Sequence, residues 1–183
     1  MFKYKELAFR AIERKDLESL RLLHNDPDTF LNLASIDFID EPGQEAWWQN
    51  LHHQKNDKRY VIVKADDHSF ILGRLRIQHL DFQNNNCEVG LDIMPGMRRM
   101  GYGQKAYEML LYFLFNHYNM NLVYLRVADF NTGSYDLYRK LGFEETGRFP
   151  QYFFRHGKYW DYVLMSLTAS AYFKKVSDLS SHL

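Results

Sequence analysis

The spacing of apolar and polar residues divides the first half of the chain into strands and helices. Leu7 to Ile12 alternates apolar with polar side chains, which predicts a strand, and Asp16 then caps a helix through about His24. Residues 26 to 45 form an irregular acidic segment that enters a second helix near Pro42. Further strands are predicted over 60–63, 69–78 and 87–94, with a turn at Asp66–Asp67 and an end at Pro95–Gly96.

The second half alternates strands with helices. Gly101 to about Tyr118 reads as a helix that is apolar on most of its circumference and is therefore buried. A strand over Leu122–Ala128 and a helix over Asn131–Leu141, stopped by Gly142, come next. The last strands are predicted over Phe143–Phe149 and Tyr152–Leu167, the second with a hairpin at His156–Gly157.

This order of elements predicts an α+β fold. Antiparallel-looking strands followed by strand-helix-strand-helix-strand favour a mixed, mostly antiparallel sheet with helices on both faces. We expect one domain over residues 1–167 and a polar tail, frayed or weakly helical, over 168–183.

Composition narrows the classes of partner. The chain is 46% hydrophobic and 16% aromatic, enough for a large core, and 23 basic residues balance 23 acidic ones. Without a global positive field, neither a nucleic acid nor a membrane surface is an expected partner. The single cysteine, Cys87, excludes an internal disulfide and a thiolate metal cluster. No signal peptide or apolar span is seen, so a cytoplasmic location is expected.

A glycine-rich turn between a strand and a helix is the first candidate site. Arg98-Arg99-Met100-Gly101-Tyr102-Gly103 follows the third predicted strand and opens the long helix. Amide groups in the first turn of a helix have no partner within the helix, and glycines let an anion approach them closely. The stretch lacks the third glycine of a dinucleotide fingerprint and the Gly-Lys-Ser/Thr of a P-loop. It reads either as an anion cradle or as an ordinary turn with solvated arginines.

A second motif favours the anion cradle over the ordinary turn. Asn131, Ser134 and Tyr138 lie on one face of the next helix, which ends in Gly142-Phe143. With Arg98, Gly101 and Gly103, these residues resemble the two motifs of the GCN5-related N-acetyltransferase superfamily, in the expected order and spacing. The resemblance is strongest over residues 70–167. It is closest to the branch of ribosomal-protein N-terminal and spermidine/spermine N-acetyltransferases.

The resemblance implies an acetyl-coenzyme A-dependent acyltransferase with this family's fold, its sheet splayed at the coenzyme. Gly90 or Pro95 would mark the splay, although Gly90 by itself also indicates a bulge or a close approach. The implied coenzyme-binding residues are Ile93, Met94, Arg98, Arg99, Met100, Gly101, Tyr102, Gly103, Gln104, Asn131, Ser134 and Tyr138. The backbone of Ile93 and Met94 would pair with the pantetheine arm.

The reaction needs a proton donor and a base. Tyr138 is the predicted donor to the leaving thiolate, as the resemblance implies, although a tyrosine there is also an ordinary amphipathic core residue. Glu88, on the strand before the cradle, is the predicted base, with Asp92 further along the same face. The alternatives are a solvent-facing Glu88 and deprotonation through ordered water.

The acceptor is expected to be a primary amine. Six carboxylates and no lysine or arginine lie between Asp26 and Glu45, a segment that borders the acceptor groove in the resembled family. They favour a cationic acceptor, such as a polyamine or a protein N-terminus, or they are ordinary helix-capping acids. An amino-sugar nucleotide acceptor and a non-catalytic coenzyme A sensor are the alternatives. No metal site is expected, since the histidines are dispersed, and the protein is expected to be a monomer or homodimer.

Overall fold

A computed structural model describes residues 1–180 of the chain. It divides into two compact units, the first formed by residues 1–79 with 89–111 and the second by residues 80–88 with the chain from 112 onward. Within the described residues, no helix is long and apolar enough to cross a membrane.

Antiparallel strands form the frame of the first unit. β1 (Phe2–Tyr4), β2 (Leu7–Ala11), β3 (Lys58–Lys64) and β4 (Ile71–Asp81) pair in this order, with Ala8 opposite Val63 and Val61 opposite Arg74. The second half of β5 (Asn86–Ile93) also belongs to this unit. The β3–β4 register shifts at Ile62/Val63. Here a Cβ on the facing Gly73 would collide with the Asp92 carbonyl, so only glycine fits this position.

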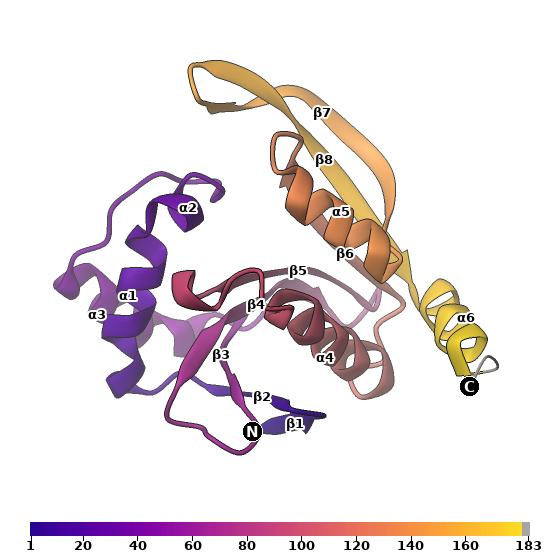
Figure 1. Cartoon of the computed structure of the whole chain (residues 1–183), viewed down its shortest axis with the longest axis horizontal. Coiled ribbons are helices and arrows are strands. Elements are labelled where there is room, and N and C mark those ends of the chain that lie inside the picture. The colour runs from indigo at the N-terminus through magenta and orange to yellow at the C-terminus, as the bar shows by residue number, and fades with distance from the viewer. Residues whose placement is uncertain (181–183) are drawn as a thin grey trace. The chain divides into compact units, whose positions relative to one another are not determined.

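Both faces of this sheet are buried. On one face Ala8, Val61 and Val63 pack with Leu20 of α1 (Leu17–Asn25), and Trp47 of α3 (Glu41–Asn50) packs against them. Figure 1 shows α1 and α3 together beside these strands. Leu7, Phe9 and Ile62 alternate to the opposite face and are buried there. α4 (Tyr102–Asn116) contributes further buried apolar side chains, among them Ala106, Tyr107 and Leu110.

The second unit is built on β6 (Leu122–Ala128). The start of β5 pairs with it in parallel, from Asn86↔Leu122 to Glu88↔Tyr124. On its other edge β8 (Lys158–Thr168) and then β7 (Glu144–Arg155) pair antiparallel, and Figure 1 shows these two strands as a long hairpin. Helix α5 (Thr132–Leu141) connects β6 to β7, and α6 (Ala169–Ser180) follows β8.

The predicted fold class and most predicted elements are confirmed. β6 has the predicted bounds, and α5 ends as predicted, because Gly142 takes the left-handed conformation with φ +106°. The hairpin turn at His156–Gly157 is also confirmed. The expected polar tail contains a regular helix, α6, whose Tyr172 ring stacks on Phe115 at 4.6 Å.

Four local predictions were wrong or incomplete. β1 and the short α2 (Pro27–Phe30) were not predicted, and β7 continues to Arg155 instead of ending near Phe149. Asp16 precedes α1 but does not cap it with its side chain. Its carboxylate instead accepts hydrogen bonds from Arg10 and from the Glu13 amide, which a sequence pattern cannot distinguish from a cap.

Candidate functional site

The predicted cradle lies where β5 passes into α4. After β5 ends at Ile93, a short 3-10 turn over Pro95–Met97 leads to the arginine–glycine stretch, and α4 starts at Tyr102. Arg99 and Gly101 take left-handed conformations, with φ of +61° and +81°. A Cβ at Gly101 would meet nothing within 4 Å, so this glycine is needed for its backbone conformation and leaves open space above the turn. This open turn at a helix start has the form that an anion cradle requires.

Arg98 has protein partners that the sequence did not reveal. Its Nη2 donates to Asp26 Oδ2 and to Thr29 Oγ1, both at 2.6 Å, and its Nη1 donates to Asp28 at 3.2 Å. Its Nε donates to the Ile93 carbonyl at 3.2 Å. Asp26 also caps α2 through the Thr29 amide. Arg98 thus connects the cradle to the acidic segment, and its charge is largely matched by carboxylates in this structure.

The backbone at the end of β5 is partly occupied. The Met94 amide donates to the Leu72 carbonyl at 2.9 Å, and the Met94 carbonyl accepts from the Met97 amide at 2.8 Å. A pantetheine arm would therefore depend on Ile93 more than on Met94, although the Ile93 carbonyl also accepts from Arg98. The role of both residues stays a prediction.

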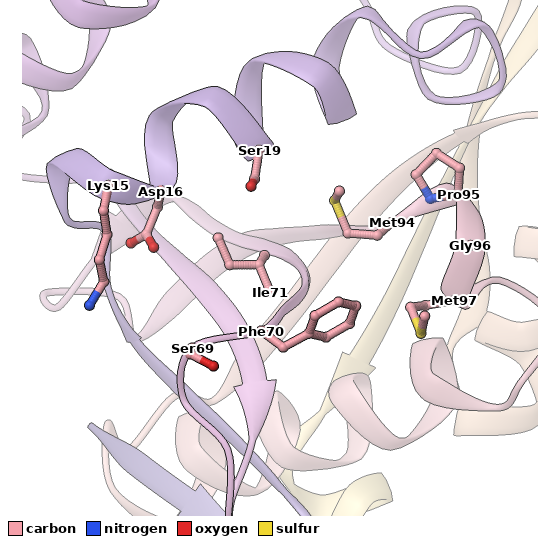
Figure 2. Close-up of a pocket in the computed structure, with 10 residues that line it drawn as sticks. All are labelled: Lys15, Asp16, Ser19, Ser69, Phe70, Ile71, Met94, Pro95, Gly96 and Met97. Atoms are coloured by element: carbon pink, nitrogen blue, oxygen red, sulfur yellow. The ribbon is translucent and has the colours of Figure 1, made fainter.

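A pocket of about 430 Å³ lies beside the cradle within the first unit. Figure 2 shows the start of α1, the start of β4 and the segment before the cradle around it. Its lining residues are Lys15, Asp16, Ser19, Ser69, Phe70, Ile71, Met94, Pro95, Gly96 and Met97. None of the residues from Arg98 to Gln104 lines it, so this pocket is separate from the predicted diphosphate site.

The second predicted motif is assembled on α5, in the second unit. Asn131 caps this helix, with its side-chain oxygen accepting from the Ser134 amide at 3.2 Å. Tyr138 is half-buried on the same helix and lies edge-on to Phe143, with ring centroids 6.1 Å apart. The Gly142 turn accounts for the Gly-Phe part of the motif. The predicted face of Asn131, Ser134 and Tyr138 is thus built by one capped helix.

Glu88 is buried and ion-paired. Only 8% of the residue is exposed, and its two carboxylate oxygens accept from Arg126 Nε and Nη2, each at 2.8 Å. The hydrogen bond to Glu88 raises the pKa of Arg126, and burial followed by the Glu88 charge raises the pKa of Tyr124. The solvent-facing alternative for Glu88 is therefore wrong. Its role as the base stays a prediction, with Arg126 competing for the lone pairs that would accept a proton.

Asp92 and Gly90 belong to an arginine cluster in the first unit. Asp92 Oδ2 accepts from Arg74 Nε at 2.7 Å and from Arg76 Nη1 at 3.0 Å. Burial opposes ionisation of Asp92, but the two arginines outweigh it and lower its pKa. A Cβ at Gly90 would come within 2.7 Å of the Arg76 guanidinium, so Gly90 marks a close approach by a side chain. The sequence had indicated a close approach there, but not which group approaches.

The predicted site residues fall in both units. Ile93, Met94 and the stretch from Arg98 to Gln104 belong to the first, and Glu88, Asn131, Ser134 and Tyr138 belong to the second. Within each unit, the predicted site residues come from a single strand-to-helix segment or from a strand and a helix of that unit. Sequence reasoning did not single out Arg74, Arg76 or Arg126, which contact the candidate residues Asp92 and Glu88, because nothing in their local sequence identifies the carboxylates that they face.

Comparison with known proteins identifies the family. The model of the acetyltransferase (GNAT) domain matches residues 6–144. The L-amino acid N-acetyltransferase AaaT of Escherichia coli is 23% identical over 163 residues, covering 88% of this chain and 97% of that protein. The spermidine N(1)-acetyltransferase of E. coli is 24% identical over 172 residues, covering 91% and 88%.

A solved structure shares the fold. Spermidine N-acetyltransferase from Vibrio cholerae, in complex with CoA and spermine, superposes with a TM-score of 0.86 at 24% identity, over 93% of this chain and 99% of that one. The predicted resemblance, fold, enzyme class and acetyl-coenzyme A donor all agree with these findings. The chain belongs to the acetyltransferase (GNAT) domain family.

Proposed function

We propose that this protein transfers the acetyl group of acetyl-coenzyme A to a primary amine by direct attack in a ternary complex. The observation that carries this proposal is the open turn at Gly101, between β5 and α4, in a chain of the acetyltransferase family. The unpaired amides at the start of α4 would hold the coenzyme's diphosphate, and Arg99 would add positive charge.

Acetyl transfer requires protonation of the departing thiolate and removal of a proton from the attacking amine. The amine nitrogen forms a bond to the acetyl carbon as the thioester carbon–sulfur bond breaks. The Tyr138 hydroxyl would donate a proton to the departing thiolate. An alkylammonium with a pKa of about 10.4 needs roughly 4 kcal/mol to become the neutral nucleophile at neutral pH. Glu88 or ordered water would take that proton.

The substrates of related enzymes indicate which primary amines to test as acceptors. The related E. coli enzymes act on spermidine and on L-amino acids, so both a polyamine and an amino acid are acceptors to test, as is a protein N-terminus. The acidic segment supports a cationic acceptor less strongly than its composition suggested. Asp26 and Asp28 contact Arg98, and the Asp40 side chain caps α3 through the Gly43 amide.

The protein is proposed to act in the cytoplasm as a monomer or homodimer. One related structure, the spermidine N-acetyltransferase of V. cholerae, is described as dodecameric. Light scattering coupled to size-exclusion chromatography measures the mass directly, and a mass of more than two chains would overturn this part of the proposal.

A thiol-release assay tests the activity. Purified protein is mixed with acetyl-coenzyme A and, separately, polyamines, amino acids, amino sugars and N-terminal peptides. We expect thiol release that depends on one amine class, with the acetylated product seen by mass spectrometry. Coenzyme binding by calorimetry without any thiol release would instead indicate a coenzyme A sensor.

A further inference from the structure

We infer that Arg74 binds an anionic group, a carboxylate or a phosphate, on the amine acceptor. The inference rests on the proposed acetyl transfer and narrows its acceptor to amines that carry such a group. Arg59, Arg74 and Arg76 lie on the neighbouring strands β3 and β4 of the first unit.

Strand pairing places these arginines on the α1 side of the sheet. Arg74 lies opposite Val61, which packs under Leu20 of α1, and directly paired residues project to the same face. Arg76 lies opposite Arg59, two positions along the same strands, and therefore shares that face. Asp92 of β5 reaches the same cluster through its contacts with Arg74 and Arg76.

Arg74 presents an open fork. Its Nε is held by Asp92 Oδ2 at 2.7 Å, which orients the planar guanidinium. In the part of the chain whose side chains the structure describes, no group accepts a hydrogen bond from its Nη1 or Nη2, and neither atom is sealed from solvent. The side chain is only 11% exposed. Two parallel donors in a recessed position suit bidentate binding of a carboxylate or phosphate.

The local charge also favours an anion. Three guanidinium groups gather here, and the carboxylates of Asp57 and Asp92 contact them. Burial, with repulsion by neighbouring arginines, lowers the pKa of both Arg59 and Arg74 despite these carboxylates. His24, at the end of α1, adds no charge while neutral, and burial lowers its pKa. An incoming anion would therefore offset the cost of burying these arginines.

The cluster adjoins the region expected to hold the reacting groups. Asp92 is followed directly by Ile93, whose backbone is predicted to pair with the pantetheine arm. On the other side, the His24 ring contacts the Asp37 carbonyl of the acidic segment at 3.0 Å, and His24 interacts electrostatically with Arg74 and Asp92. The Arg74 fork is thus a contact for the acceptor on the α1 side of the first unit.

Matched pairs of amines test this preference in the wild-type protein. Lysine and cadaverine differ by one carboxylate, and glucosamine 6-phosphate and glucosamine differ by one phosphate. We expect kcat/KM in the thiol-release assay to be about tenfold to a hundredfold higher for the member of one pair that carries the carboxylate or phosphate. The pair that shows the effect identifies the group as carboxylate or phosphate.

Variants then assign the preference to Arg74. Arg74→Gln should raise the KM of the amine that carries the carboxylate or phosphate by about tenfold or more, and leave that of its partner without this group and of acetyl-coenzyme A nearly unchanged. Arg74→Lys keeps the charge without the fork and should restore part of the preference. Arg14→Gln is the matched control, because the Arg14 side chain is 76% exposed and forms a surface ion pair with Glu45 at 3.4 Å.

A wild-type measurement covers the case in which Arg74→Gln does not fold. Acetate or inorganic phosphate should then inhibit competitively against the amine and not against acetyl-coenzyme A. The inference about Arg74 would be overturned if cadaverine and glucosamine had kcat/KM values equal to or higher than those of lysine and glucosamine 6-phosphate. An equal loss of kcat/KM for both members of a pair in Arg74→Gln would also overturn it. Neither result would contradict the proposed acetyltransferase activity. No thiol release with any amine would overturn the proposed activity itself.

Discussion

At the scale of single residues, the sequence predicts backbone conformation better than it predicts side-chain partners. Gly101 and Gly142 are glycines because their φ angles are positive, and the sequence motif already indicated both positions. Arg98 was predicted to face a diphosphate, yet it contacts Asp26, 72 positions away in the chain. A residue's own conformation is thus more predictable than its partner.

Tyr138→Phe tests the proposed proton donor. Removing only the hydroxyl should leave acetyl-coenzyme A affinity nearly unchanged and lower turnover by about 10²–10⁴. Steady-state kinetics and calorimetry measure the two effects separately. Tyr135→Phe is the control on the same helix, because the Tyr135 hydroxyl donates to Glu145 at 3.0 Å instead. Unchanged turnover in Tyr138→Phe would remove this residue from the mechanism.

Gly101→Val tests the cradle. A Cβ at this position meets no protein atom within 4 Å, so the main cost within the protein is that of the left-handed backbone, about 1–2 kcal/mol. It would also occupy the space above the turn, and we therefore expect weaker coenzyme binding by calorimetry. Gly96→Ala is the control, since a Cβ there meets nothing either and Gly96 lies before the cradle. Wild-type affinity in Gly101→Val would show that the diphosphate binds elsewhere.

At the scale of elements, helix starts depend on which side chain reaches the first amides. Asn131 caps α5 as its place in the motif suggested, and Asp26 caps the unpredicted α2. Asp16 stands before α1 in the same way, but its carboxylate is held by Arg10 Nη1 and Nη2 at 2.7 and 2.9 Å. The sequence pattern locates the start of the helix, and tertiary packing determines whether the acidic side chain caps it or forms an ion pair.

Asp16→Asn tests that buried pair. The exchange leaves the buried Arg10 guanidinium without its countercharge, and we expect a loss of roughly 3 kcal/mol or more in the free energy of unfolding. Denaturant titration measures it. The exposed Asp66→Asn, in the β3–β4 turn, should change little.

The same pair makes stability depend on pH. Burial opposes ionisation of Asp16, but hydrogen bonds from Arg10 and the Glu13 amide outweigh it and lower its pKa below the ordinary value of about 3.9. The stabilisation is therefore complete above that value and is lost as the pH falls through the lower, folded-state value. Unfolding measured at falling pH should show a steeper loss for wild type than for Asp16→Asn. Parallel pH profiles would contradict this assignment.

At the scale of the whole molecule, the C-terminal segment contributes to the second unit. The Tyr172 ring stacks on Phe115 at 4.6 Å, and the Ala169 amide donates to the Asn121 carbonyl at 2.9 Å. Tyr172→Ala should reduce the free energy of unfolding by about 1–2 kcal/mol, since it removes a ring from a packed aromatic pair. Thermal denaturation measures this change. Lys174→Ala, at an exposed position of α6, is the control, and equal melting temperatures would show that α6 adds no stability.

Most of the secondary structure and both family motifs were predictable from the sequence, because each depends on residues that lie close together in the chain. Alternation gave β6 its bounds, and the glycine at 142 ended α5. The short β1 and α2 were missed because few residues define them, and β7 was placed too short because it contains an irregular stretch between Phe149 and Phe153.

The sequence by itself determined the family, the fold class and the glycine turn where we expect the coenzyme's diphosphate, since each depends on residues close together in the chain. Only the tertiary structure decided how the charges are paired: Arg98 with Asp26, Glu88 with Arg126, and Arg74 with Asp92. The physical reason is that an ion pair depends on strand register and helix packing, which bring distant residues within hydrogen-bonding distance. The contact that we propose between Arg74 and the acceptor depends on such a pairing, so it could be inferred only from the folded chain.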